Sequence, residues 1–445
     1  MSKHFRPWKI DQPQLLPPSV QDFVPRDHLS RFIVELVRES LDLSEITGSY
    51  TSALGQPPFD PRLMVALLLN GYASGIYSSR RIAKACIERA DFMMIAALDA
   101  PDFRTISDFR KRHLKQLAGL FVQVLVAEKA GLVRLGHVAL DGTKIKANAS
   151  KHKAMSYERM KKREVELQAE VDRWLAAAEA ADAEDDRLHG NNRGDELPDW
   201  VADKQKRIAR IAEAKAELEA EAKAAADEER RIEADKQKNR EAEGRKQTGK
   251  PAAPRSDEPA PKAQRNFTAP ESRILKTKDG FIQGYNAQAA VDGKAQIIVA
   301  HALTPSGSDH GQLVPLVDGI EANLGRKPQQ ASADSGYLSE ANLASLDQRG
   351  IDGYIATGRA KRPTADNGKI GGPLTQAMRK KIADGGFETP YRLRKQIVEA
   401  VFGQIKQGRG FRQFLLRGLE NVRAEWAIIC TAHNLVKLGN LARAA

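Results

Sequence analysis

The feature that most constrains the fold of this chain is an abrupt change in composition after Ser150. The residues before it, HVALDGTKIKANAS from 137 to 150, have the apolar and β-branched character of a strand. The chain from 151 to 248 then consists mainly of Ala, Glu, Lys and Arg, and β-type sequence resumes only near Asn266. An insertion therefore divides one domain into two parts.

The insertion has the spacing of long helices. Apolar residues recur at seven-residue intervals in two series, Met160, Leu167 and Trp174, then Ile211, Leu218, Ala225 and Ile232. A polar stretch, DRLHGNNRGDELPDW, separates the two series. We predict two long helices that form an antiparallel, coiled-coil-like hairpin over 151–248. The Pro-rich and basic residues 249–265 predict a flexible linker.

The N-terminal residues 1–131 predict an all-α domain. Apolar residues follow three- and four-residue spacing from Leu29 to Leu41. Asp60 and Pro61 mark a helix start, because Asp is a good cap and Pro is favoured at the first helical position.

A second short helix follows that one across a Gly-containing turn. Ser78 and Ser79 predict its start, and Arg80 and Arg81 are its first basic residues. The pair suits a helix-turn-helix that directs these arginines toward DNA. A plain helical hairpin would have the same pattern.

The divided domain alternates strand and helix patterns. Residues 284–302 predict a β-hairpin, and two helix patterns then alternate with two short strand patterns before a last helix. With the first strand, residues 132–150 and 266–410 predict a mixed five-stranded sheet with flanking helices. This is the element order of an RNase H-like α/β core. Residues 411–445 predict a C-terminal helical segment.

Composition limits the architecture and the partners. With 41% hydrophobic and 6% aromatic residues, we expect two or three domains and no single continuous core. The 70 Lys and Arg outnumber the 58 Asp and Glu, for a net charge of +12, which favours nucleic acid as a partner. Cys86 and Cys430 lie in apolar segments, so thiolates cannot supply a disulfide framework or a zinc site.

Neither a signal-peptide pattern nor a run of about eighteen apolar residues occurs in the sequence. We therefore expect a soluble, cytoplasmic protein that does not enter a membrane.

Two aspartates stand where α/β sheets present functional side chains. Asp141 and Asp334 each follow an apolar strand pattern, and we expect each to close its strand. Asp-Gly and Asp-Ser-Gly are also ordinary turn sequences, so each aspartate taken singly has a structural explanation too.

A third acid, Glu399, lies on a basic helix. On a helical wheel, its side of the helix also carries Arg392, Lys395 and Lys406, and the opposite side carries Leu393, Ile397, Val401 and Ile405. A solvated face with salt bridges would have the same local pattern. From residue 377 to 423, however, eleven Lys or Arg stand against four Asp or Glu. Such a surface around one carboxylate is typical of a metal-dependent enzyme that binds DNA.

Three such carboxylates suit phosphodiester chemistry. Two divalent cations roughly 4 Å apart can activate an attacking oxygen and neutralise a leaving one. Carboxylate oxygens are ligands that Mg²⁺ prefers. We expect Asp141 to bridge two Mg²⁺ or Mn²⁺ ions, with Asp334 and Glu399 binding one each.

Other chemistries find less support. The sequence has no P-loop, GxSxG, HExxH or Cys/His ligand pattern. His301, Asp309 and His310 could also bind a metal, but they adjoin a Thr-Pro-Ser-Gly turn, which makes a direct role less favoured.

Several motifs in fixed order resemble the DDE transposases of bacterial insertion sequences. These are ALDGTKIKANAS, GYNAQAAVD with QIIVA, ADSGYLSEANL and YRLRKQIVEAVFGQIKQ. The N-terminal PPFDPRLMVALLLNGYASGIYSSRRIAKAC and DFRTISDFRKRH are similar to the helical domain that these enzymes carry before the catalytic core. The resemblance covers nearly the whole chain except the insertion and the linker.

The resemblance implies that Asp141, Asp334 and Glu399 are the three catalytic, metal-binding acids. It also implies a Tyr-Arg-Glu-Lys signature whose basic residues contact transposon-end DNA. Candidate DNA-binding residues are Lys406, Arg392, Arg394, Lys395, Tyr391, Arg80, Arg81 and Lys144. The sequence departs from the signature, because Tyr391 lies one residue too early and Lys395 occupies the expected Arg position.

The expected function is transposition, in which the protein binds terminal inverted repeats, cleaves the ends and transfers 3′-hydroxyls into target DNA. We expect double-stranded DNA as partner and a homodimer or higher oligomer, since two ends must be joined together. The insertion would contact a second subunit or the DNA end, or would be a solvated hairpin without a partner. Alternatives are a nuclease of the same fold that cannot join DNA, and a non-catalytic, transposase-derived DNA-binding protein.

Overall fold

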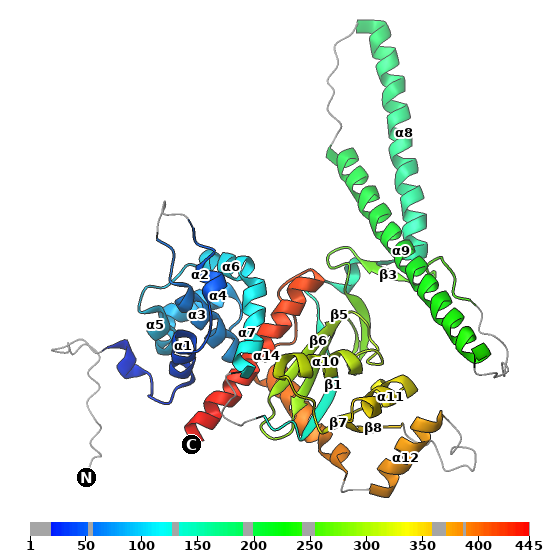
Figure 1. The fold of residues 1–445 in the computed structure, drawn as a ribbon. Helices are drawn as coiled ribbons and strands as arrows, with labels where there is room; N and C mark the ends of the chain where they lie inside the picture. The colour runs from blue at the N-terminus through cyan, green and yellow to red at the C-terminus, as the bar shows by residue number, and fades with distance from the viewer. Residues whose placement is uncertain are drawn as a thin grey trace, which may run out of the picture.

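A computed structural model of the chain describes residues 19–51, 57–126, 133–189, 199–242, 254–357, 371–385 and 389–444. The molecule has a helical N-terminal part, a central β-sheet with flanking helices, and a long helical arm that projects from the sheet (Figure 1). Within the described ranges, no helix is both long and apolar enough to cross a membrane.

The sheet has six strands, with β1 at its centre. The strands are β1 (His137–Lys146), β4 (Arg273–Thr277), β5 (Gly280–Asp292), β6 (Ile298–Thr304), β7 (Gln330–Ala333) and β8 (Asp352–Ile355). β1 pairs with β5 antiparallel and with β7 parallel, while β6 pairs with β5 and β8 with β7. The strand order is therefore β4-β5-β1-β7-β8, with β6 also paired to β5, and this mixed sheet fits the predicted α/β core.

Our prediction of five strands is wrong, because it misses β4. The chain turns at Lys278 and Asp279, and β4 pairs with the first residues of β5, beginning with Thr277 opposite Gly280, whose φ is 109°. Lys276 lies opposite Phe281 in this pairing. The charged residues Arg273 and Lys276 in β4 are typical of an edge strand.

Helices flank the sheet. These are α10 (Leu313–Leu324) against β5 and β6, α11 (Glu340–Gln348) and α12 (Pro373–Gly385) against β8, and α14 (Leu419–Ala444) against β6. The helix that carries Glu399 consists of three consecutive pieces, η8 (Lys395–Glu399), α13 (Ala400–Gly403) and η9 (Gln404–Gly408). Its first piece contacts β1 and β5, which places it beside the centre of the sheet.

The N-terminal part is helical as predicted. Its elements are η1 (Val20–Phe23), α1 (Leu29–Glu39), α2 (Ser44–Thr47), α3 (Pro61–Ala73), α4 (Ser79–Glu88), α5 (Ala90–Ala96), α6 (Phe103–Arg112) and α7 (Leu114–Val126). Asp60 caps α3 by accepting a hydrogen bond from the Arg62 amide, and Pro61 is the first helical residue. Ser78 occupies the cap position of α4 but makes no side-chain capping bond.

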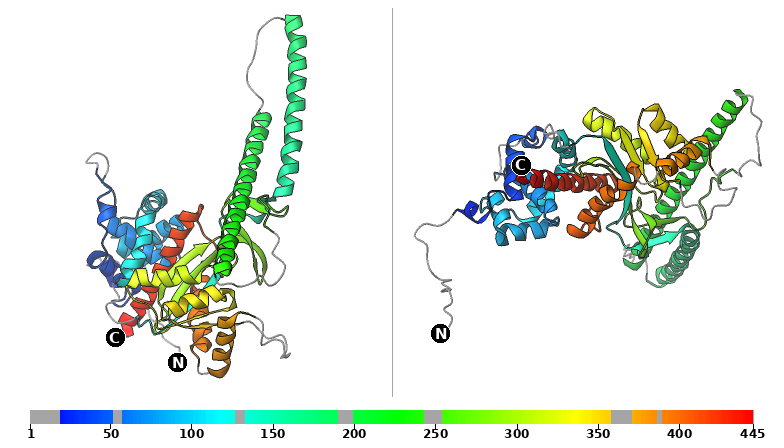
Figure 2. Two further views of the ribbon diagram at one scale, coloured as in Figure 1. Left: turned by 45° about the vertical axis from the view of Figure 1, so that its right-hand side comes forward. Right: turned by 90° about the horizontal axis from the view of Figure 1, so that it is seen from below.

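One hydrophobic core joins the N-terminal helices to the sheet, and the arm has a separate core, so the chain has no single continuous core, as composition led us to expect. The core shared by the N-terminal helices and the sheet ranges from Ile33 to Leu435 and leaves out the insertion. The two parts share it because of α14, which contacts α3 and α7 on one side and β6 on another and lies between the two parts in every view (Figures 1 and 2). Trp426 and Ile429 are among its fully buried side chains. Because a helix with apolar residues on all sides can pack against two neighbours, α14 can bury apolar side chains of the N-terminal helices and of the sheet at the same time.

The insertion forms an antiparallel helical arm, as predicted. Its helices are α8 (Tyr157–His189) and α9 (Asp199–Ala242). Two ion pairs show that the helices are antiparallel. Glu164 of α8 pairs with Lys215 of α9, and the later residue Glu170 pairs with the earlier residue Lys204, each at 2.6 Å. The structure does not describe residues 190–198, which contain most of the predicted polar break, nor the side chain of Trp174.

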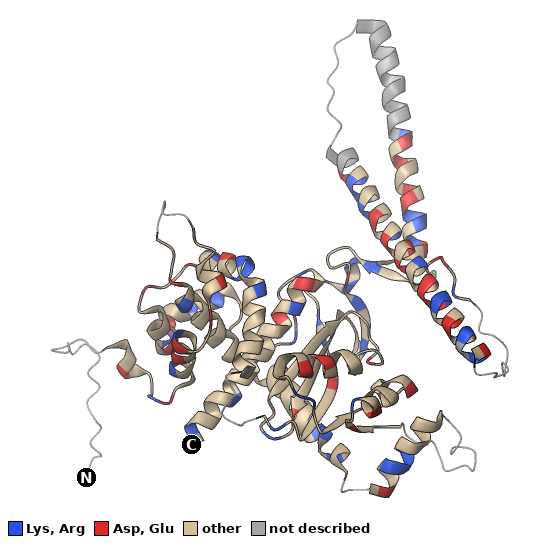
Figure 3. Ribbon diagram, in the orientation of Figure 1, with Lys and Arg blue, Asp and Glu red and all other residues tan. Residues whose placement is uncertain are grey.

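The arm has its own small core. Met160, Leu167, Ile211 and Leu218 are buried as the heptads predict, together with Tyr157. Ile232 is exposed, however, because α9 continues past the start of α8 and loses its partner helix there. Acidic and basic side chains are interspersed along both helices (Figure 3). This pattern differs from the basic stripe expected of a surface that follows DNA.

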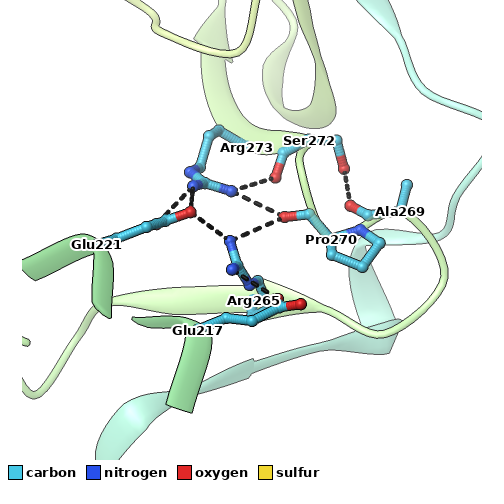
Figure 4. A network of polar contacts seen from close by, with 7 residues as sticks. All are labelled: Glu217, Glu221, Arg265, Ala269, Pro270, Ser272 and Arg273. Carbon is cyan, nitrogen blue, oxygen red and sulfur yellow. Dashed lines mark hydrogen bonds and ion pairs between the residues drawn. The ribbon is translucent and has the colours of Figure 1, made fainter. Parts of the chain in front are cut away.

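A polar clamp fixes the base of the arm. The short strands β2 (Ala154–Ser156) and β3 (Gln264–Asn266) pair there, so the linker that we predicted over 249–265 is ordered at its end; its residues 249–253 lie outside the described ranges. Arg265 is almost fully buried and forms ion pairs with Glu217 at 2.6 Å and with Glu221 at 2.7 Å. Glu221 also bonds Arg273 of β4 at 2.8 Å (Figure 4).

We expect Arg265→Ala to loosen the arm without unfolding the sheet. Because both glutamates are about half exposed, we expect the arm to lose about 1 to 2 kcal/mol of its free energy of unfolding, less than the loss for a fully buried ion pair. Hydrogen exchange of the β2, β3 and α9 amides should then accelerate about tenfold. Arg231→Ala is the matched control, because its pair with Glu228 is exposed and lies within one helix. Equal protection in both variants would contradict the clamp.

Candidate active site

A cleft of about 860 Å³ opens at the centre of the sheet. Its walls come from β1, the β4–β5 turn, the loop after β6, the end of β7 and the helix that carries Glu399. Its lining includes Asp141, Gly142, Thr143, Lys144, Lys276, Lys278, Asp279, Asn286, Asp309, Asp334, Glu399 and Lys406. The three predicted acids therefore line one cavity, although 258 positions separate the first from the last (399 minus 141).

Asp141 lies in the middle of β1 and does not close it, contrary to our prediction. The strand continues to Lys146, and Asp141 lies opposite Ala289 of β5. The Asp-Gly pair is not a turn here, because β5 pairs with β1 on both sides of it, from Val138 opposite Asp292 to Lys146 opposite Gly284. A structural role as a turn residue is thereby excluded for Asp141.

Asp334 does follow its strand, as we predicted for the end of β7. Its carboxylate Oδ1 accepts a hydrogen bond from the Gly336 amide at 2.8 Å and caps the short helical turn η4 (Ser335–Tyr337). The side chain also lines the cleft. Asp334 therefore both caps the turn and lines the cleft.

The helix before Glu399 contains a π-helical turn, η8. A π turn holds one more residue than an α turn, so it rotates the preceding residues relative to a regular wheel. Arg394 is consequently buried and directed toward Asp141, while Lys395 is exposed. Leu393, which the regular wheel places on the buried side, is exposed instead.

This turn explains the irregular signature in the sequence. The one-residue displacement of Tyr391 from its expected spacing to Glu399 is absorbed by the extra residue of η8. Tyr391 and Arg394 stay together, with the guanidinium carbon 6.0 Å from the ring centroid. Arg394 therefore contacts Asp141, whereas Lys395 is exposed.

Arg394 and Asp141 form a nearly buried ion pair. The guanidinium Nη1 donates to Asp141 Oδ2 at 2.8 Å, and the side chains are 7% and 16% exposed. Burial raises the pKa of Asp141 to about 6, Arg394 opposes this, and the nearby Asp334 carboxylate adds to it. The site thus holds a partly desolvated anion whose charge is only partly compensated.

We expect Asp141→Asn to stabilise the metal-free protein at alkaline pH. The pKa of Asp141 is about 6 in the folded chain against 3.8 as a reference, so the folded chain binds this proton more tightly. The free energy of unfolding therefore falls as the pH rises through this interval. Urea unfolding in chelator should show the variant more stable by about 1 to 3 kcal/mol at pH 8, with the difference shrinking toward zero near pH 4. A parent at least as stable as the variant at pH 8 would contradict this.

Two lysines are fixed beside the acids. Lys406 Nζ donates to Thr143 Oγ1 at 3.1 Å and to the Lys144 carbonyl at 3.2 Å. Burial lowers the pKa of Lys406, and the Arg412 charge acts in the same direction. Lys144 Nζ donates to the Lys276 carbonyl at 2.9 Å. These ammonium groups, with Lys278, give the cleft a cationic wall that suits a phosphate backbone.

The remaining predicted basic residues lie outside the cleft lining. Arg392 is exposed on the helix surface, as are Arg80 and Arg81 on α4. The Arg80 guanidinium lies over the Phe103 ring, 4.9 Å from its centroid. The turn before α4 is anchored, since Tyr77 donates to the Gly410 carbonyl at 3.1 Å. The N-terminal helices are thereby tied to the end of the Glu399 helix.

The alternative metal ligands His301, Asp309 and His310 do not lie together in the structure. His301 packs edge-on against Phe121 and lines a different cavity, and burial lowers its pKa to about 4. His310 is exposed. Only Asp309 of the three reaches the cleft, because residues on β6 and on the loop after it face different sides of the sheet.

Several polar residues that line the cleft are not among the predicted site residues. Lys276 lies near the end of the unpredicted strand β4 and Asp279 in the turn after it, whose Asp-Gly signal was available in the sequence. Asn286 lies on β5 in the motif GYNAQAAVD. Asp309 lies in the loop after β6, and we had considered it only together with the two histidines.

The donors suit a hard divalent cation in kind, since they are carboxylate and amide oxygens. As the side chains stand, no three Asp, Glu, His or Cys among the described residues are gathered closely enough to hold an ion. The Arg394 guanidinium engages one oxygen of the Asp141 carboxylate, Oδ2.

Comparisons with known proteins match two stretches of the chain. Residues 18–112 match the family described as Transposase domain (DUF772), and residues 257–435 match the family described as Transposase DDE domain. Asp334 and Glu399 fall within the second stretch, and Asp141 precedes it. Searches of curated proteins and of solved structures give no match.

Proposed function

We propose that the chain, which matches a transposase domain over residues 18–112 and a transposase DDE domain over residues 257–435, is a transposase that cuts the ends of its own mobile element and joins them to target DNA. The observation that carries the proposal is the shared cleft. Asp141, Asp334 and Glu399 line it together, and fixed lysines form its wall. Acids for metal ions and cations for phosphates are the two requirements of this chemistry.

Divalent cations such as Mg²⁺ or Mn²⁺, when bound, supply activation of the attacking oxygen and stabilisation of the leaving one. Asp141, Asp334 and Glu399 would hold them. No protein nucleophile is needed, since water attacks in cleavage and a DNA 3′-hydroxyl attacks in joining. The role of the chain is therefore to bind and orient the reactants.

The basic residues would position the DNA. Lys406 is held by Thr143 and the Lys144 carbonyl, so its ammonium is fixed beside the acids before a phosphate arrives. Arg394 forms an ion pair with Asp141 in the free protein. Once released, its planar guanidinium can donate two hydrogen bonds to one phosphate.

The helical N-terminal part would recognise the element's ends. The exposed Arg80 and Arg81 open α4, behind a turn that is anchored to the catalytic helix. Contacts at this helix would thus set the register of the DNA in the cleft. Because two ends must be joined together, we propose a dimer or higher oligomer. The interspersed charges of the arm favour a protein contact over a DNA contact (Figure 3).

The test is a cleavage and joining assay with the full-length protein. Labelled linear DNA that carries the terminal inverted repeats is incubated with Mg²⁺ or Mn²⁺ and a target plasmid. We expect nicks at the element ends and covalent end-to-target products. Cleavage without joined products would select a nuclease of the same fold. Binding of the ends without any metal-dependent cleavage would select a DNA-binding protein.

A further inference from the structure

Two buried amides on β5 hold the carboxylate of Asp309. Asn286 and Gln288 are two residues apart, so both side chains lie on the same face of the strand. Asn286 Nδ2 donates to Asp309 Oδ1 at 2.7 Å, and Gln288 Nε2 donates to the same oxygen at 2.6 Å. Both amides are essentially inaccessible to solvent. The carboxylate is thus fixed by groups that cannot easily move.

The amides are themselves held in place. The Tyr337 hydroxyl donates to Gln288 Oε1, and both side chains are buried. Trp426 Nε1 donates to the Gln288 carbonyl at 3.0 Å and fixes the backbone at the same point. Residues from β5, η4 and α14 therefore cooperate to orient Asp309.

Asp309 lies close to two glycines that follow the first two acids in the chain, Gly142 and Gly336. Its Oδ1 is 2.7 Å from the point that a Cβ on Gly142 would occupy, next to Asp141 in β1. Its Oδ2 is 3.0 Å from the corresponding point at Gly336, and Asp334 Oδ1 is 3.0 Å from that same point. Among the described residues, Oδ2 accepts no hydrogen bond. One oxygen is anchored, and the other faces Asp334.

A role in loop structure alone does not explain this arrangement. The backbone carbonyl of Asp309 accepts the bond from the Gln312 amide that forms the turn, so the turn does not need the carboxylate. Holding an anion beside Asp141 and Asp334 brings like charges together, which is unfavourable unless a cation compensates them. Carboxylates that bind metals are in turn held by hydrogen bonds.

We propose that Asp309 is a fourth carboxylate of the active site, which presents Oδ2 beside Asp334 as an oxygen ligand for a divalent cation and is oriented by Asn286 and Gln288. This inference rests on the proposed function, since it concerns the same cleft. It extends that function by assigning a ligand from the loop after β6.

The test measures Mn²⁺ binding to the full-length protein, with and without end DNA, from the electron paramagnetic resonance signal of free Mn²⁺. Asp309→Asn keeps the shape and an acceptor oxygen, and we expect it to weaken Mn²⁺ binding by about tenfold or more. Asp309→Glu should recover part of the affinity. Glu321→Gln, an exposed acid on α10, is the matched control and should bind Mn²⁺ as the parent does.

Each result decides the matter. Parental Mn²⁺ affinity in Asp309→Asn, alongside weakened affinity in Asp334→Asn, would overturn the inference and leave the proposed function intact. Loss of DNA cleavage in Asp309→Asn at parental Mn²⁺ affinity would also overturn the role as a ligand. Absence of Mn²⁺ binding by the parent, together with absence of cleavage, would overturn the proposed function itself. Urea unfolding of each variant separates these outcomes from misfolding.

Discussion

Replacing Asp334 by asparagine should lower metal-dependent cleavage of element ends by about a thousandfold. An amide oxygen is a weaker, neutral ligand, so the variant loses charge where cations would bind. The fold should survive, because the asparagine oxygen can still accept the Gly336 amide bond that caps η4. The measurement is the single-turnover rate of nicking on end-labelled DNA with saturating Mg²⁺.

The control for this variant is Asp347→Asn, which changes the same chemical group on α11 outside the cleft. It should cleave at the parental rate, and both variants should bind end DNA as the parent does. Parental cleavage by Asp334→Asn would remove Asp334 from the catalytic set. Loss of DNA binding or of the unfolding transition would instead indicate structural damage.

Gly142→Ala should disable the site while leaving the chain folded. A Cβ at this position would overlap Gln288 Nε2 and approach Asp309 Oδ1 to 2.7 Å and Asn286 Oδ1 to 2.8 Å. The three atoms belong to the ends of side chains. Because hydrogen bonds link both amides to Asp309 and the amides are buried, the three side chains must shift together. A displacement of about 1 Å in a preorganised site can cost roughly a hundredfold in rate. Overpacking should lower the free energy of unfolding by only about 1 to 3 kcal/mol.

Gly311→Ala is the matched control, because a Cβ at Gly311 would meet no atom within 4 Å. Its cleavage rate and urea midpoint should equal those of the parent. If Gly142→Ala cleaves DNA at the parental rate, the amide and carboxylate array around β1 is not part of the machinery. If it fails to unfold cooperatively, the glycine serves the fold rather than the site.

Much of the local structure could be predicted from short stretches of sequence. The start of α3 at Asp60 and Pro61 was predictable because a cap needs only a few adjacent residues. The β5–β6 hairpin and the helical arm followed from two-residue and seven-residue periods. The family was recognisable because several motifs occur in a fixed order, and the matched stretches agree with it.

Other features depend on residues far apart in the chain. The prediction that Asp141 closes its strand failed because the sequence of β1 does not reveal how far β5 continues beside it. The exposure of Ile232 depends on where α8 begins, not on the heptad itself. The shared core depends on α14, whose apolar sides are divided between two neighbours only in the folded chain.

The sequence by itself determined all but one strand of the sheet, the helices and the arm, because periodicity and capping depend on a few consecutive residues. It also predicted Asp141, Asp334 and Glu399 as the acids of the site, because several motifs occur in a fixed order. Only the tertiary structure decided that a π turn directs Arg394 to Asp141, and that Asp309 reaches the same cleft. The physical reason is that side-chain direction and burial result from packing between distant segments, where one extra residue in a helical turn rotates everything before it.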